Sequence, residues 1–171
     1  VAVLHRAKNE QMEVGRTRLL TANCKGKNRE SLSDGELVSH YDWFGDHGIL
    51  AWCHRKETGN RYHFFDLERN VCSVVGEGVL TCDGHFSFSP TQDRILTDTN
   101  PNEQYERTLL LYQLSTERRI NLGKFYSPPV KDWQIRCDLH PRWSRDGKAV
   151  CIDSMQERHR QLYKIDVSKI I

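Results

Sequence analysis

Three histidines recur at equivalent places along the chain, and they are the side chains best suited to chemistry. His40, His85 and His140 each precede an aromatic residue by three positions, and each opens a β-rich segment. The aromatic residues are Trp43, Phe88 and Trp143. Neutral imidazole is a common ligand of divalent transition metals and also a general base. Three imidazoles that converged on one place would therefore form a metal site.

The segment that leads to His140 supplies candidates for a further ligand. It reads Gln134-Ile135-Arg136-Cys137-Asp138-Leu139. Cys137 would favour zinc, whereas Gln134 or Asp138 would favour a harder ion. The alternative is that the histidines only hydrogen-bond neighbouring backbone and hold adjacent sheets in register.

Arg136 and Arg142 flank the same histidine and could bind a carboxylate-bearing sugar, because a guanidinium recognises a carboxylate through two parallel hydrogen bonds. The alternative for Arg142 is an ion pair with an acidic strand residue such as Asp42 or Asp153. Tyr126 falls in a predicted loop that could overhang the same site; alone, it reads as an ordinary packing aromatic.

A repeat along the chain explains why the histidines are equivalent. A polar turn and a β-rich strand follow each histidine, and a third strand that begins with arginine comes next. Gly48 and the pair Asp146-Gly147 are residues that tolerate positive φ at such turns. A repeat of roughly 40 to 50 residues is typical of β-propellers. The third strands are expected to begin at Arg16, Arg61, Arg107 and Arg160.

The fold class predicted is all-β, a partial propeller of four-stranded antiparallel blades. Residues 1–38 form the rear of a blade, 39–83 and 84–138 form whole blades, and 139–171 form an incomplete last blade. Each histidine then opens an innermost strand beside the central channel. The alternative is a β-sandwich, which also has short strands at even spacing.

Propellers close with typically four to eight blades, so this chain is expected to be a piece of one. Upstream sequence or self-association would supply the missing blades. A truncated fragment without activity of its own is a further alternative.

The net charge and the cysteines of the chain indicate which partners and which cellular compartment to expect. The net charge of +2 on 171 residues gives no strongly basic or acidic field, so neither nucleic acid nor a membrane is an expected partner. The six cysteines show no CxxC pair, and most of them read as free thiols. A reducing compartment, and thus a cytoplasmic rather than periplasmic location, is the expectation.

The pattern His-x-x-Trp-Ser-x-Asp-Gly-Lys at His140 to Lys148, followed by a β-strand, resembles the repeat shared by TolB-type, WD40-like propellers and the oligogalacturonate lyases. The longer stretch from Arg136 to Lys148, RCDLHPRWSRDGK, is similar to a motif in many bacterial propellers of this group. The resemblance covers about residues 39–171. It implies a seven-bladed propeller with a metal, usually manganese, held by histidine and glutamine in the channel. It also implies β-elimination on an acidic oligosaccharide, with a histidine as base.

Carried over by position, the resemblance makes His85 and His140 metal ligands and His40 the base. Asp138 stands where those lyases have a further histidine, Ile135 stands where they have a glutamine, and Gln134 is one place away. Propeller-type ulvan lyases suggest a variant in which His40, Tyr126 and Arg136 serve as base, acid and neutraliser. The remaining alternative is a non-catalytic TolB-like propeller that binds protein or carbohydrate.

Overall fold

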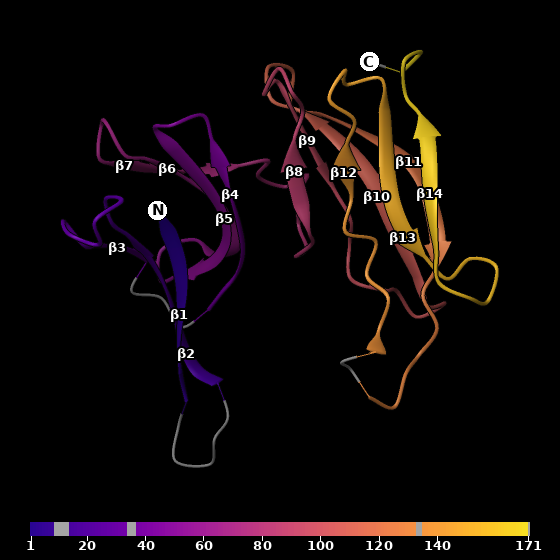
Figure 1. The fold of residues 1–171 in the computed structure, drawn as a ribbon, viewed down its shortest axis with the longest axis horizontal. Coiled ribbons are helices and arrows are strands. Elements are labelled where there is room, and N and C mark those ends of the chain that lie inside the picture. Colours follow the sequence, from indigo (N-terminus) through magenta and orange to yellow (C-terminus); the bar gives the residue numbers. More distant parts are fainter. Residues whose placement is uncertain (9–13, 34–36, 133–134, 171) are drawn as a thin grey trace. The chain divides into compact units, whose positions relative to one another are not determined.

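The computed structural model describes residues 1–8, 14–33, 37–132 and 135–170. Strands in this part of the chain form four antiparallel sheets, and it contains no α-helix (Figure 1). No helix long and apolar enough to cross a membrane exists among these residues either. The chain divides into two compact units, Val1–Thr81 and Cys82–Ile171, which are described separately.

The first unit holds two sheets, in each of which strands that follow one another in sequence lie side by side. The first sheet has the order β1-β2-β3 and the second has the order β4-β5-β6-β7. The strands are β1 (Ala2–Lys8), β2 (Val14–Thr21), β3 (Glu30–Ser33), β4 (Val38–Phe44), β5 (Gly48–Arg55), β6 (Gly59–Asp66) and β7 (Val71–Val75).

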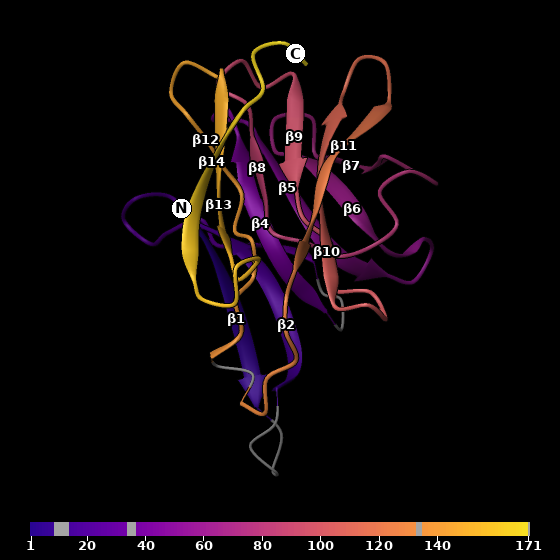
Figure 2. The same cartoon turned by 90° about the vertical axis from the view of Figure 1, so that its right-hand side faces the viewer.

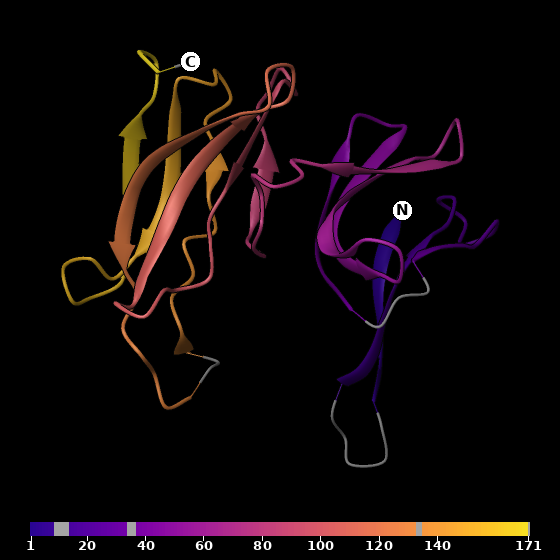
Figure 3. The ribbon, with the colours of Figure 1, turned by 180° about the vertical axis from the view of Figure 1, so that it is seen from behind.

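The second unit repeats the arrangement with the orders β8-β9-β10-β11 and β12-β13-β14 (Figures 2 and 3). Its strands are β8 (Phe86–Phe88), β9 (Arg94–Thr97), β10 (Glu106–Gln113), β11 (Arg118–Tyr126), β12 (Arg142–Trp143), β13 (Ala149–Ser154) and β14 (Gln161–Asp166). The predicted all-β class is confirmed, and the repeat places each of the three histidines at or just before the first strand of a sheet.

One of the two turn predictions was right. Gly147 has φ of 70° in the turn between β12 and β13, as the Asp-Gly pair predicts. Gly48 was assigned to the wrong role: the positive φ in the β4–β5 turn belongs to Gly45, at 59°, while Gly48 already begins β5. A Cβ at position 48 would lie only 2.4 Å from the ring of Phe64, so glycine is needed there to make room for that ring.

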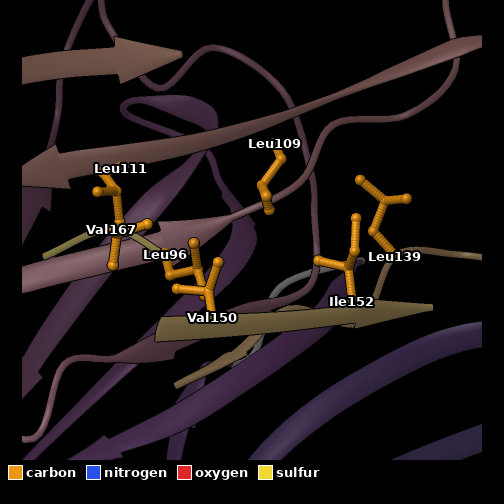
Figure 4. Close-up of a cluster of buried hydrophobic side chains, with 7 residues drawn as sticks. All are labelled: Leu96, Leu109, Leu111, Leu139, Val150, Ile152 and Val167. Carbon is orange, nitrogen blue, oxygen red and sulfur yellow. The ribbon is translucent and has the colours of Figure 1, made fainter. Parts of the chain in front are cut away.

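Each unit has a hydrophobic core between its two sheets. In the second unit the core joins strands β9 and β10 to β13, with the segments around Leu139 and Val167 at its margins (Figure 4). Its members are Leu96, Leu109, Leu111, Leu139, Val150, Ile152 and Val167, all at most 1% exposed. Figure 4 shows Leu139 and Ile152 side by side, so the segment before His140 is anchored in this core.

The core of the first unit is built in the same way from Leu19, Val38, Ile49, Ala51, Cys53 and Phe65. A hydrogen bond from the Tyr41 hydroxyl to the carbonyl oxygen of Ala2, 2.8 Å long, also links its two sheets.

Candidate functional site

Two of the repeated histidines meet in the second unit. His85 immediately precedes β8 and His140 lies two residues before β12, and these two strands are neighbours. The Ser87 hydroxyl donates a hydrogen bond to the carbonyl oxygen of Pro141, 3.1 Å away, which fastens one strand to the other. The two imidazole rings consequently lie with centroids 4.1 Å apart and planes inclined at 56°.

Asp138 completes a cluster of three groups that could hold one metal ion. One donor atom from each of His85, Asp138 and His140 lies within 4.8 Å of the other two. His85 Nε2 is 3.8 Å from Asp138 Oδ2. Metal bonds of about 2.0–2.2 Å place two ligands of one ion at most about 4.4 Å apart, so at most a small rotation is needed. Two nitrogens and one oxygen suit zinc and manganese alike.

Asp98 fixes the position of both histidine-bearing segments. Its Oδ1 accepts a hydrogen bond from the backbone N–H of His85 (2.6 Å), and its Oδ2 accepts one from the backbone N–H of Leu139 (3.1 Å). The same Oδ1 lies 3.4 Å from His85 Nδ1. A carboxylate at the far nitrogen of an imidazole typically orients a metal ligand. Asp98 is 1% exposed, so this link is part of the core.

Gly84 allows the close approach on which this link depends. A Cβ at this position would lie 1.9 Å from the carbonyl oxygen of Asp98. Any larger residue would force the segment that carries His85 away from Asp98.

Two arginines hold the carboxylate of Asp138. Arg107, on β10, forms an ion pair with Oδ1 (2.5 Å), and Arg136 donates a hydrogen bond from Nε to Oδ2 (2.7 Å). Burial by itself would raise the pKa of Asp138, but the hydrogen bond from Arg136 and the charge of Arg107 outweigh it and hold this pKa below its ordinary value. Asp138 is therefore ionised at neutral pH, the state that a metal ligand requires.

His140 is the most accessible member of the cluster, with a side chain that is 50% exposed. Burial of part of the ring and the neighbouring His85 lower its pKa, although Asp138, Asp98 and Asp153 oppose the shift. The imidazole is thus neutral at pH 7 and able to coordinate. Its φ of 41° lies in the left-handed region, which is rare for residues other than glycine and often marks functional sites.

The two predicted arginines, Arg136 and Arg142, bind carboxylates in or next to the cluster. Arg142 donates a hydrogen bond to Asp153 Oδ2 (3.4 Å), which is the alternative that its sequence context raised. Asp153 Oδ2 also lies 3.9 Å from His140 Nδ1. The side chains of Arg136 and Arg142 are 45% and 50% exposed, so both can reach a ligand from solvent.

Cys137, a further metal-ligand candidate, is not part of this cluster. The thiol of Cys137 is buried, 3.9 Å from the carbonyl oxygen of Asp138, and burial raises its pKa, which keeps it protonated. Gln134 lies outside the described residues.

The two remaining catalytic candidates, Tyr126 and His40, are not members of the cluster of His85, Asp138 and His140. Tyr126 ends β11 instead of belonging to a loop, its N–H donates to Gln156 Oε1 (2.7 Å), and the Arg158 guanidinium lies 5.0 Å from its ring centroid. His40 is in β4 of the first unit, where it pairs with Trp52 across the sheet. The roles predicted for both residues stay predictions.

Sequence reasoning missed Asp98 and Arg107. A signal for Asp98 was present, because Asp98 and Asp153 both end the second strand segment of their repeats, at the fifth residue of Arg94–Asp98 and Ala149–Asp153. Arg107 was predicted only to begin a third strand, with no part in the site; it forms a buried ion pair with Asp138, a member of the cluster.

No protein-family model and no curated protein sequence matches the chain. Solved structures do. TolB from Acinetobacter baumannii aligns with a TM-score of 0.73 and 19% identity, over 95% of this chain and 38% of that one. A putative TolB from Agrobacterium tumefaciens aligns with a TM-score of 0.65 and 10% identity, over 97% of this chain and 54% of that one.

The fold is that of a TolB-like β-propeller. Its sheets are the blades of the propeller, and the chain spans 38% and 54% of the length of the two TolB structures. An oligogalacturonate lyase in complex with manganese also aligns, with a TM-score of 0.46 and 11% identity, over 88% of this chain and 52% of that one.

Proposed function

We propose that this TolB-like propeller binds a divalent metal ion at His85, Asp138 and His140 and acts as a lyase on oligosaccharides that contain uronic acids. The observation that carries the proposal is the convergence of two imidazoles and one carboxylate, with donor atoms within 4.8 Å of one another. Manganese and zinc are both candidates for the ion.

The residues around the proposed site would have separate roles in the reaction. A bound ion would supply Lewis-acid polarisation of the substrate carboxylate. Asp98 would keep the Nε2 atom of His85 directed at the ion, and Arg136 or Arg142 would bind the carboxylate of the sugar. Both arginines are exposed enough to do so.

The reaction is β-elimination. A base removes the proton at C5, the carbon next to the carboxylate, and the C4–O bond breaks, so that a double bond forms between C4 and C5. The leaving oxygen takes up a proton. His40 is the proposed base and Tyr126 a proposed acid.

Elemental analysis of the purified protein tests the metal site directly. The wild type should carry close to one equivalent of a divalent transition metal, and the double variant His85→Ala, His140→Ala should carry none. The activity test follows the ultraviolet absorbance of the conjugated double bond in oligogalacturonides and other uronic-acid oligosaccharides, with and without a chelator. No absorbance increase with any uronide would exclude the lyase reaction.

A second candidate function is non-catalytic binding of protein or carbohydrate. The observation that favours it is that Arg107 and Arg136 already neutralise Asp138, so the cluster can stand as an ion-pair network without a metal. This function predicts no bound metal and a melting temperature that a chelator does not change.

A further inference from the structure

The two arginines that bind Asp138 are held to very different degrees. Arg107 is buried, and besides its ion pair with Oδ1 it donates to the carbonyl oxygen of Thr99 (3.0 Å) and to the Ser127 hydroxyl (3.2 Å). Arg136 reaches Oδ2 through Nε, and 45% of its side chain is exposed. Arg107 therefore belongs to the framework of the protein, whereas nearly half of the Arg136 side chain faces solvent, from which a ligand can approach it.

Arg136 binds the oxygen that a metal would need. Oδ2 of Asp138 is the carboxylate atom 3.8 Å from His85 Nε2, and it is also the acceptor of the Arg136 hydrogen bond. A cation shared by His85 and Asp138 would lie next to the guanidinium of Arg136. The two positive charges repel each other at this distance, and they compete for one oxygen.

We propose that Arg136 is an exchangeable partner of Asp138, which a bound divalent ion displaces and a substrate carboxylate then recruits. This inference rests on the metal site of the proposed function and adds its regulation. Without metal, Arg136 is occupied by an internal carboxylate. With metal, Asp138 Oδ2 is taken up by the ion, and the guanidinium is available to a uronate carboxylate.

The exchange couples the two ligands. Because the ion releases the group that binds the uronate, the ion raises the affinity for uronate, and by linkage uronate raises the affinity for the ion by the same factor. Coupling between two ligands typically amounts to about 5-fold to 150-fold in affinity.

Isothermal titration calorimetry with Mn²⁺, and separately with Zn²⁺, in the absence and presence of galacturonate tests the exchange. In the wild type, saturating galacturonate should tighten metal binding about fivefold or more. Galactose, which lacks the carboxylate, should leave it unchanged. In Arg136→Gln, metal should bind at least as tightly as in the wild type without sugar, because its competitor is gone, and galacturonate should have no effect.

Arg145→Gln is the matched control, since it removes the same charge from the turn between β12 and β13 and should retain the coupling. Circular dichroism melting of each variant checks that it is folded, and Arg136→Lys provides a second substitution that keeps the charge. Weaker metal binding in Arg136→Gln, or coupling that persists in it, would overturn the exchange. A wild type that binds metal without coupling overturns this inference alone, and one that binds neither metal overturns the proposed function as well.

Discussion

The blade β4–β7 in the first unit and the two sheets of the second unit carry the same histidine but give it different neighbours. His40 pairs with Trp52 across its sheet. The corresponding residue beside His85 is Asp98, and the one beside His140 is Asp153. Trp52 is 5% exposed and packs edge-on against the Tyr62 ring, with centroids 5.0 Å apart.

The difference shows that a repeated histidine is not by itself a site. A carboxylate at the next strand orients the imidazole, whereas an indole in the same place adds to the apolar core. The comparison therefore distinguishes His85 and His140, the proposed metal ligands, from His40.

The largest effect should come from Arg107, which the sequence repeat aligns with Arg61 in the other blade. Arg107→Met leaves Asp138 buried without its inner partner and should lower the free energy of unfolding by about 3–5 kcal/mol. The side chain of Arg61 donates to the adjacent carbonyl oxygen of Asn60. Arg61→Met should therefore lower the free energy of unfolding by less than about 0.5 kcal/mol. Urea denaturation compares the two. Equal losses would remove the distinction between the blades.

Replacing His85 should weaken metal binding, whereas replacing His40 should not. His85→Ala removes one of three donors and should weaken Mn²⁺ or Zn²⁺ binding by about 100-fold or more. His40→Ala should leave the affinity unchanged, because the cluster within the second unit has its three donors without it. Calorimetric titration measures both. A comparable loss in His40→Ala would mean that all three histidines share one ion.

A smaller effect is expected from the carboxylates beside the histidines. Asp98→Asn keeps the size of the side chain but removes its charge, and should weaken metal binding by about 10-fold to 100-fold. Asp153→Asn should have less effect, since Asp153 lies 3.9 Å from His140 and is more exposed than the buried Asp98. The order of the two affinities, measured on variants with unchanged melting temperatures, decides whether Asp98 is the principal positioning residue.

The smallest effect should be on stability at acid pH, and it concerns His63, which is not part of the cluster. Burial lowers the pKa of His63, although a hydrogen bond to the Arg61 carbonyl oxygen opposes the shift and the charge of Arg55 adds to it. The folded form therefore binds a proton less readily than the unfolded chain, and stability should fall as the pH drops below about 6.5. His63→Gln should make this fall shallower in denaturation curves recorded between neutral and mildly acidic pH. An unchanged slope would assign the acid sensitivity to other groups, such as His140.

The repeat made the fold predictable, because turn residues and alternating strands are local properties of the sequence. Gly147 behaved as its Asp-Gly pair predicts, while the role of Gly48 depended on the ring of Phe64, which lies on another strand. Tyr126 was expected in a loop because Pro128 and Pro129 follow soon after it, but pairing with Glu106 extends β11 to this residue.

The site was predictable only in part. The repeated histidines stand out in the sequence, and Asp138 was visible beside them. Arg107 could not be assigned, because its contact with Asp138 joins residues that are 31 positions apart and depends on how the segment before β12 packs on β10. The repeat marks the position of Asp98, but its role depends on the folded chain, in which its two oxygens accept hydrogen bonds from backbone groups of two different segments.

The backbone of His140 has a consequence for protein engineering. A residue with a side chain at φ of 41° carries a conformational strain of about 1–2 kcal/mol that glycine would not. Position 140 is thus one at which stability and metal binding favour different residues. A search for stabilising substitutions would select glycine there and, in doing so, remove the most accessible of the proposed metal ligands.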